Sequence, residues 1–255
     1  LRSISQLDVA IRTGQMQVYI QPKTAADGVR VVGGEALVRW IKPDNQMVFP
    51  GDFIPIFEKS GDIITLDYFV YKEVFKYQRN RLDNKLPVVP ISVNVSKLHL
   101  KNDNLQRYLE RLFMDYKMPV ELIELELTEN VYIENMDQAM RLLNWCKNKH
   151  IKIAMDDFGS GYSSLNMLDQ VSVDIMKIDK TFLKNEVLQK NECIILEHVV
   201  SMADKMDIIT VCEGVESKEQ LNFLAEIGCN VIQGYYVGKP MPMKDFDQYL
   251  ETHVV

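Results

Sequence analysis

The fold is decided by residues 122–157, which read LIELELTENVYIENMDQAMRLLNWCKNKHIKIAMDD. Apolar residues and residues that favour strands dominate two runs, Leu122 to Leu127 and Ile151 to Met155. Between these runs, apolar residues recur three and four positions apart from Met136 to Lys149, as they do on one face of a helix. The segment therefore predicts a strand, a helix and a second strand, an order that is typical of a parallel sheet.

The same alternation extends through the chain. The other strand runs are Val18–Ile20, Val31–Trp40, Val88–Val95, Val173–Ile178 and Ile208–Val211, and the other helix candidates are Ile63–Arg81, Asn104–Tyr116, Glu186–Met206 and Lys218–Ile227. Roughly seven or eight such units, with no Gly-x-Gly-x-x-Gly after an early strand, favour an α/β barrel of the TIM type, (β/α)₈, over an open doubly wound sheet. We interpret residues 1–255 as a single domain.

The composition indicates a soluble globular protein, since 47% of the 255 residues are hydrophobic and 25% are charged. No apolar run is long enough to span a bilayer, and the first residues, Leu1 to Ser5, lack the charged and apolar regions of a signal peptide, so we expect a cytoplasmic domain without membrane contact. The formal net charge of −7 disfavours a nucleic-acid polymer as a partner.

The cysteines form no Cys-x-x-Cys pair, which fits a reducing compartment better than a disulfide or zinc framework. The four positions are Cys146, Cys193, Cys212 and Cys229. We interpret them as small buried apolar residues.

Polar side chains end nearly every predicted strand, where barrel enzymes place their active sites. They are Glu35, Asn94, Glu126, Glu129, Asp156, Asp157, Lys177, Asp179, Glu213 and Gln233. Five of them are carboxylates that would converge on one end of the barrel, namely Glu35, Glu126, Asp156, Asp157 and Glu213. Lys177 supplies a single positive charge against their mutual repulsion. One or two divalent cations would complete the site, and a set of oxygen ligands suits Mg²⁺ or Mn²⁺ better than Zn²⁺.

Such ions are the usual means of hydrolysing a phosphodiester, because they lower the pKa of a bound water and stabilise the leaving oxygen. Lys177 could orient the resulting hydroxide, Arg39 could clamp a phosphate, and Gln21 could hydrogen-bond a ligand from the first strand.

Each of these residues alone also fits a structural role. A strand-end acid is often a helix cap or a solvated charge, Arg39 fits a surface ion pair, and Asn94 fits the cap of the next helix. Asp179 and Glu216 also fit a structural role, as acids that lie just outside the ligand set. It is the convergence of five or more positions that favours a site.

The chain resembles the EAL domain family in a series of motifs from Val18 to Phe246. In chain order they are Gln21-Pro22, Glu35-Ala36-Leu37-Val38-Arg39-Trp40, Phe53-Ile54-Pro55, Ser92-Val93-Asn94-Val95-Ser96, Glu124 to Glu129, Asp156 to Ser164, Lys177-Ile178-Asp179, Glu213-Gly214-Val215-Glu216 and Gln233-Gly234-Tyr235. The resemblance implies a modified (β/α)₈ barrel with an antiparallel first strand that hydrolyses the bacterial second messenger cyclic di-GMP to linear pGpG.

The resemblance also implies roles for the residues. The metal ligands of the family correspond here to Glu35, Asn94, Glu126, Asp156, Asp157 and Glu213, of which Glu35 and Glu213 also count as catalytic. Lys177 corresponds to the lysine that holds the attacking water, and Gln21, Arg39 and Gln233 correspond to contacts of the substrate or of the water at the metals.

Glu129 corresponds to an acid that anchors the loop from Asp157 to Ser164, which the family uses in dimer contacts and regulation. We group Asp179, Glu216 and Ser160 with this loop, and Ser160 stands where threonine is usual. The resemblance implies a homodimer. It also implies a longer signalling protein in which sensory or GGDEF domains precede this one, in keeping with a first residue that is not Met.

Two alternatives to an active enzyme remain open at the level of sequence. Some family members with eroded motifs bind cyclic di-GMP without hydrolysing it and act as receptors. An interaction domain that ignores the nucleotide is a further alternative. The complete ligand set favours the phosphodiesterase.

Overall fold

A closed barrel of eight strands lies at the centre of the computed structural model, over the residues that the structure describes, 6–160, 165–183 and 189–253. The strands are β1 (Met16–Ala25), β2 (Val31–Ile41), β4 (Ile91–Asn94), β5 (Ile123–Thr128), β6 (Lys152–Phe158), β7 (Ile175–Ile178), β8 (Ile209–Cys212) and β9 (Val231–Gln233). From β2 to β9 the barrel neighbours are parallel, whereas β1 closes the barrel by pairing antiparallel with both β2 and β9. The predicted barrel with an antiparallel first strand is confirmed.

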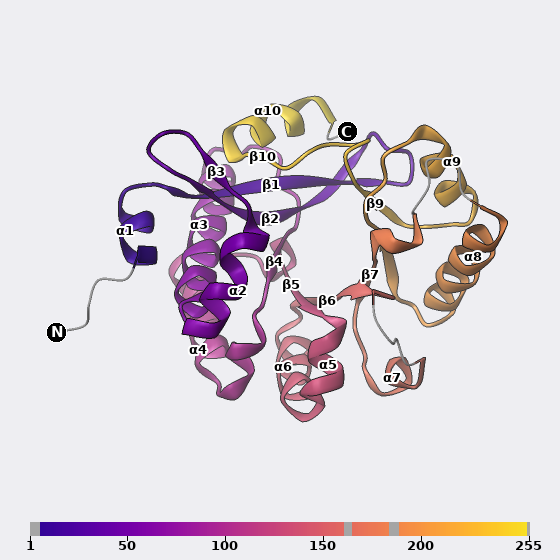
Figure 1. Cartoon of the computed structure of the whole chain (residues 1–255), viewed down its shortest axis with the longest axis horizontal. Helices are drawn as coiled ribbons and strands as arrows, with labels where there is room; N and C mark the ends of the chain where they lie inside the picture. The colour runs from indigo at the N-terminus through magenta and orange to yellow at the C-terminus, as the bar shows by residue number, and fades with distance from the viewer. Residues whose placement is uncertain (1–5, 161–164, 184–188, 254–255) are drawn as a thin grey trace.

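Helices cover the outside of the barrel (Figure 1). They are α1 (Gln6–Arg12), α2 (Pro50–Ser60), α3 (Ile63–Asp83), α4 (Asn104–Asp115), α5 (Glu129–Glu134), α6 (Met136–Lys149), α7 (Leu165–Gln170), α8 (Lys190–Lys205), α9 (Lys218–Glu226) and α10 (Met243–His253). Helices α3 and α4 lie on one side of the molecule and α8 and α9 on the opposite side. Three short 3₁₀ helices, η1 (Lys97–Lys101), η2 (Val120–Leu122) and η3 (Lys180–Phe182), and the two-residue strands β3 (Met47–Val48) and β10 (Met241–Pro242) complete the described elements.

The strand predicted over Val88–Val95 is shorter in the structure, because β4 begins only at Ile91. Pro90 has no backbone N–H to donate to a neighbouring strand, although its carbonyl still accepts a bond of 2.9 Å from the N–H of Gly34. The helix predicted from Glu186 begins at Lys190 as α8, and residues 184–188 lie outside the described residues.

Helices α2 and α10 are the two long helices that the sequence pattern does not indicate. A proline inside α2, Pro55, conceals that helix in the sequence. The structure nonetheless fixes α2 against β2, because Trp40 contacts both Phe53 and Phe57, with ring centroids 5.8 and 6.1 Å apart. This packing places α2 beside the carboxyl end of β2.

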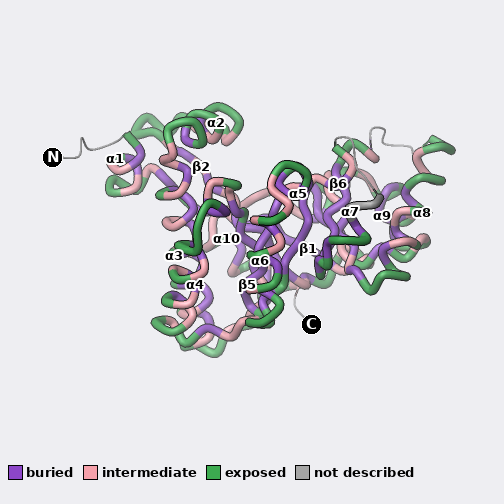
Figure 2. Tube along the Cα trace, turned by 90° about the horizontal axis from the view of Figure 1, so that it is seen from below, coloured by how far each residue is buried: buried purple, intermediate pink, exposed green. Residues whose placement is uncertain are grey.

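The apolar core has two layers. A large outer layer lies between the barrel and its helices, and the buried segments of Figure 2 follow the strands while exposed segments lie on the outer helix faces. A small inner layer inside the barrel is formed by Ala154, Ile175 and Val211, with Ile209 and Val231 packed against them. Of the carboxylates described below, Asp156 and Asp157 lie on the strand that carries Ala154, and Glu213 directly follows the strand that carries Val211.

None of the helices in the described part of the chain combines the length and the apolarity that a membrane crossing requires.

Candidate active site

Lys177, on β7, lies at the centre of the acidic residues from the strand ends. Its side chain is buried, with an exposed fraction of 1%. The Nζ atom lies 2.7 Å from Oε2 of Glu126, 2.8 Å from Oε1 of Glu213, 2.9 Å from Oδ1 of Asp156 and 3.1 Å from Oε2 of Glu35. An ammonium group has three hydrogens, so it cannot donate to all four carboxylates at once. The structure thus brings four of the five predicted carboxylates onto one cation.

A second buried lysine, Lys23 on β1, lies on the other side of Glu126. Its Nζ atom is 2.9 Å from Oε1 of Glu126 and 2.8 Å from Oγ of Ser92, and it is 3.9 Å from Oε2 of Glu124. The hydroxyl of Ser92 in turn lies 3.3 Å from the carbonyl oxygen of Gly34. The carboxylate of Glu126 is therefore held between two ammonium groups, one at each oxygen.

Three amide side chains surround Glu35. Asn94 donates from Nδ2 to Oε1 of Glu35 at 3.0 Å, and Gln233 donates from Nε2 to Oε2 at 2.6 Å. The same Nε2 atom of Gln233 lies 3.3 Å from Oε1 of Gln21, whose own Nε2 donates to the carbonyl oxygen of Gly238 at 3.1 Å. Glu35 thus has a fixed orientation, and the amide oxygen of Asn94 remains available as a ligand atom.

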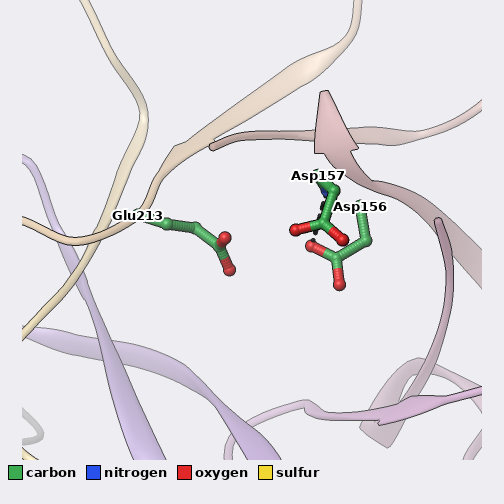
Figure 3. A group of neighbouring side chains, drawn as sticks. All are labelled: Asp156, Asp157 and Glu213. Atoms are coloured by element: carbon green, nitrogen blue, oxygen red, sulfur yellow. Dashed lines mark hydrogen bonds between the residues drawn. The ribbon is translucent and has the colours of Figure 1, made fainter. Parts of the chain in front are cut away.

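The backbone at Asp157 brings two consecutive carboxylates to the same side of the strand. Neighbouring strand residues ordinarily point to opposite faces. Here the pairing of β6 with β7 shifts its register between Met155 and Phe158, and Asp157 has a φ of 57°. Carboxylate oxygens of Asp156, Asp157 and Glu213 all lie within 4.8 Å of one another. In Figure 3 the two aspartates stand together and the side chain of Glu213 points toward them from the segment after β8, which is separated from β6 only by β7.

The charges of the site act strongly on each other. Burial opposes ionisation of Glu126, yet the ammonium groups of Lys177 and Lys23 lower its pKa to about 2. Burial disfavours the ammonium form of Lys177, but the surrounding carboxylates hold its pKa well above the usual value. Burial, followed by repulsion from nearby carboxylates, raises the pKa of Asp156 well above its usual value, and burial also raises the pKa of Glu213. The site therefore holds more acidic groups than its lysines neutralise.

This excess of carboxylates fits a site for divalent cations. Six carboxylates, those of Glu35, Glu124, Glu126, Asp156, Asp157 and Glu213, lie together with only two ammonium groups, those of Lys23 and Lys177. Every candidate ligand atom is an oxygen, from a carboxylate or from the amide of Asn94, and hard divalent cations prefer such oxygens. The oxygens of Asp156, Asp157 and Glu213 are close enough together to hold one ion.

Two cavities open on either side of Glu35. The larger measures about 440 Å³ and is lined by residues that include Gln21, Asp157 and Glu216. The other measures about 370 Å³ and is lined by residues that include Arg39 and Asn94. Glu35 and Leu37 line both cavities.

Arg39 and Asp179 lie around the cluster without joining it. The guanidinium carbon of Arg39 lies 5.8 Å above the ring centroid of Tyr19, and its Nη1 donates to the carbonyl oxygen of Val38 at 2.8 Å. Asp179 accepts a bond of 2.8 Å from the N–H of Thr181 and caps η3, while also lining the larger cavity together with Glu216. The cap role that the sequence left open for Asp179 is thus present.

Glu129 fixes the chain just after β6. It is buried at the start of α5, and its Oε2 accepts a bond of 3.0 Å from the N–H of Gly159. Ser160 is exposed, and its N–H donates to the carbonyl oxygen of Asp157 at 3.0 Å. The rest of the predicted loop, residues 161–164, lies outside the described residues. Glu129 therefore connects α5 to the backbone that carries Asp157.

Sequence reasoning missed the residues beneath the carboxylates. Lys23, Ser92 and Glu124 each lie two positions from a predicted site residue, namely Gln21, Asn94 and Glu126. Because strand side chains alternate with a period of two, residues two apart share a face. The spacing of two residues from a predicted site residue was therefore the sequence feature that could have identified these three side chains.

Comparisons with known proteins identify the relatives of this chain. The family model described as the EAL domain matches residues 4–240. The chain is similar to the bifunctional diguanylate cyclase/cyclic di-GMP phosphodiesterase MucR of Pseudomonas aeruginosa. The two sequences are 31% identical over 242 residues, and these residues make up 95% of this chain and 35% of MucR. It is 31% identical over 252 residues to the probable cyclic di-GMP phosphodiesterase PdeN of Escherichia coli, covering 98% of this chain and 48% of PdeN. The chain spans only between 30% and 35% of the length of three similar proteins, namely MucR, the signaling protein YkoW of Bacillus subtilis and the oxygen sensor protein DosP of Escherichia coli.

Solved structures show the same architecture. The PaMucR phosphodiesterase in complex with c-di-GMP has a TM-score of 0.87 at 31% identity, over 94% of this chain and 97% of that one. The cGMP-bound EAL enzyme Bd1971 has a TM-score of 0.88 at 27% identity, over 96% of this chain and 68% of that one. With a family model that spans nearly the whole sequence and a barrel of the same shape, the chain belongs to the EAL domain family.

Proposed function

We propose that this chain is a phosphodiesterase that uses Mg²⁺ or Mn²⁺ to hydrolyse cyclic di-GMP to linear pGpG. The observation that carries the proposal is the set of carboxylates around Lys177, which opens on cavities at both sides of Glu35. Similar proteins named as cyclic di-GMP phosphodiesterases, and the similar PaMucR structure in complex with c-di-GMP, support the choice of substrate.

The proposed metal ligands are Glu35, Asn94, Glu126, Asp156, Asp157 and Glu213, all of which offer oxygen atoms at one end of the barrel. One or two bound cations would supply a water of lowered pKa and would stabilise the leaving oxygen of the phosphodiester. Glu35 and Glu213, the two proposed catalytic acids, both contact Lys177, at 3.1 and 2.8 Å from its Nζ atom.

The remaining polar groups bind and orient the reactants. Lys177 is assigned to hold the attacking water, because its ammonium is buried, charged and surrounded by the proposed ligands. Gln21 and Gln233 offer amide groups beside Glu35, and Arg39 offers a planar cation for a phosphate at the second cavity.

The loop that follows Asp157 is proposed to regulate the site. Glu129 anchors the backbone of Gly159 and thereby restrains Asp157 two residues earlier. Ser160 lies in this segment, and Asp179 and Glu216 line the cavity that Asp157 also lines. We further propose that residues 1–255 form one cytoplasmic domain of a longer signalling protein, which pairs as a homodimer and is joined to sensory or GGDEF domains.

A receptor that binds cyclic di-GMP without hydrolysis is the competing function. It would not need the whole set of acids, and all of the proposed ligands are present here. Hydrolysis is therefore favoured.

The test is incubation of the purified domain with cyclic di-GMP, once with Mg²⁺ or Mn²⁺ and once with EDTA, followed by ion-pair chromatography of the nucleotides. We expect pGpG only with metal. Glu126→Gln should form no product, whereas Glu251→Gln, which changes an exposed acid on α10, should behave as wild type. Nucleotide binding without any product from the wild type would identify a receptor instead.

A further inference from the structure

Glu126 is held differently from the other carboxylates of the cluster. Its two oxygens face two different lysines, since Oε2 lies 2.7 Å from Nζ of Lys177 and Oε1 lies 2.9 Å from Nζ of Lys23. Its side chain is fully buried. A carboxylate with one oxygen fixed on each side cannot rotate about its last bond without losing both contacts.

Lys23 is itself firmly placed. Its side chain has an exposed fraction of 4%, and its ammonium contacts the hydroxyl of Ser92 at 2.8 Å as well as Glu126. The hydroxyl of Ser92 lies against the backbone carbonyl of Gly34, one residue before Glu35. Lys23 is thus tied to β2 and β4 at a level just below the cluster. It does not line either of the cavities beside Glu35.

We propose that Lys23 is a positioning residue for the metal site: it holds Oε1 of Glu126 so that Oε2 faces Lys177 and the bound cations. Lys23 acts through Glu126, because it is not among the residues that line the two cavities. The inference deepens the proposed hydrolysis and rests on it for its significance, although its test does not depend on turnover. Groups that orient a metal ligand in this way typically change metal affinity by roughly 10–100-fold when removed.

Positioning and simple charge balance predict opposite results. If Lys23 served only as a nearby positive charge, its removal would strengthen the binding of a cation, because repulsion between like charges would disappear. If it orients Glu126, its removal weakens cation binding in spite of that electrostatic gain. The direction of the change therefore separates the two roles.

The experiment is a titration of the metal-free protein with Mn²⁺, followed by electron paramagnetic resonance of the free ion. We expect Lys23→Met to weaken Mn²⁺ binding by at least about tenfold. Lys152→Met is the matched control, because Lys152 is an exposed lysine at the start of β6, in register with Glu124. We expect its affinity to equal that of the wild type.

Lys23→Met leaves Glu124 and Glu126 with less positive charge nearby, so circular dichroism is used to check that the variant folds. A double variant, Lys23→Met with Glu124→Leu, removes the lysine together with its more distant carboxylate, and such apolar replacement of buried ions is often tolerated. It should bind Mn²⁺ as weakly as the single variant. Unchanged or tighter binding in either folded variant overturns the proposal.

Turnover is measured on the same samples. A wild-type protein that binds Mn²⁺ but forms no pGpG would refute the proposed hydrolysis and leave the comparison of affinities intact. In an active wild type, we expect Lys23→Met to need at least about ten times more Mn²⁺ for half-maximal turnover.

Discussion

Asp156 and Asp157 are consecutive residues of one strand, yet their carboxylate oxygens lie within 4.8 Å of each other and of Glu213. The positive φ of Asp157, 57°, and the register shift beside it turn the second side chain toward the first. The N–H of Asp157 also donates to Oδ1 of Asp156 at 3.0 Å. A local change in backbone conformation thus creates a pair of ligands that a regular strand would not provide.

Replacing Asp157 by glycine tests this pair. Glycine adopts positive φ readily, so the backbone is expected to stay in place while the carboxylate is lost. We expect turnover to fall by more than about 100-fold, which exceeds the usual effect of residues that only support a ligand. Asp157→Asn, which keeps one oxygen, should retain more activity than Asp157→Gly. Equal and near-normal rates of pGpG formation in both variants would exclude Asp157 as a ligand.

Lys177→Met should separate stability from catalysis. Removing the ammonium leaves four carboxylates, three of them buried, without their shared cation, and the loss of one partner from a buried ion pair costs about 3–5 kcal/mol. Urea unfolding in EDTA should show this loss. Mg²⁺ should recover much of the stability, because cations bind the folded site, but it should not recover turnover. A variant as stable as the wild type in EDTA would contradict the central position of Lys177.

The stability of the metal-free protein should depend on pH through Asp156. Burial raises the pKa of this group in the folded state, so the folded protein binds its proton more tightly than the unfolded chain does. This contribution is present at low pH and is lost as the pH rises through the folded-state pKa. In EDTA, Asp156→Asn should therefore gain stability relative to the wild type as the pH rises from about 4 to about 7. Urea midpoints across this range measure the difference, and a constant difference would refute the shift.

Arg39 should act on substrate binding. Its side chain is half-buried above Tyr19 and lines the cavity of about 370 Å³. The loss of a charged hydrogen bond to a phosphate costs about 1.5–3 kcal/mol, which corresponds to roughly 10–100-fold in kcat/KM. We expect this loss in Arg39→Ala, and a partial loss in Arg39→Lys because lysine lacks the planar fork. Steady-state kinetics with saturating Mg²⁺ measure this loss. An unaltered kcat/KM in Arg39→Ala would show that Arg39 does not bind the substrate.

Gly234 should be intolerant of any side chain. A Cβ atom at this position would lie 2.2 Å from both N and O of Val215, which are backbone atoms that cannot move aside easily. Gly234→Ala should therefore lower the free energy of unfolding by about 1–3 kcal/mol or more. Gly51→Ala is the matched control on α2, where a Cβ meets nothing within 4 Å. Thermal unfolding of the two variants should differ clearly, and equal melting temperatures would be contrary to this packing.

The barrel was predictable because its strands and most of its helices carry clear periodicity. The run Ile151 to Met155 and the helix from Met136 to Lys149 both appear in the structure within a few residues of their predicted bounds. Helix α2 was not predicted, because Pro55 interrupts its pattern and its apolar side chains are held by contacts with Trp40 on β2. Such tertiary contacts leave no local signal.

The membership of the carboxylate cluster followed from the strand ends, but its arrangement did not. Nothing in the sequence shows that Lys177 contacts four acids, because that depends on the tilt and register of strands far apart in the chain. The turn of Asp157 to the side of Asp156 depends on a backbone angle that aspartate only tolerates and does not require. Lys23 was overlooked because a single lysine in a first strand resembles a surface residue.

The pair of Lys23 and Glu124 has a consequence for how relatives of this chain diverge. Their charged atoms lie 3.9 Å apart inside the barrel, and loss of either one alone would leave the other with less compensation in a buried place. Substitution at one position is therefore accepted most readily when the other changes too. In an alignment of related barrels, positions 23 and 124 should vary together, with the charged pair replaced jointly by apolar residues only in barrels that do not rely on this metal site.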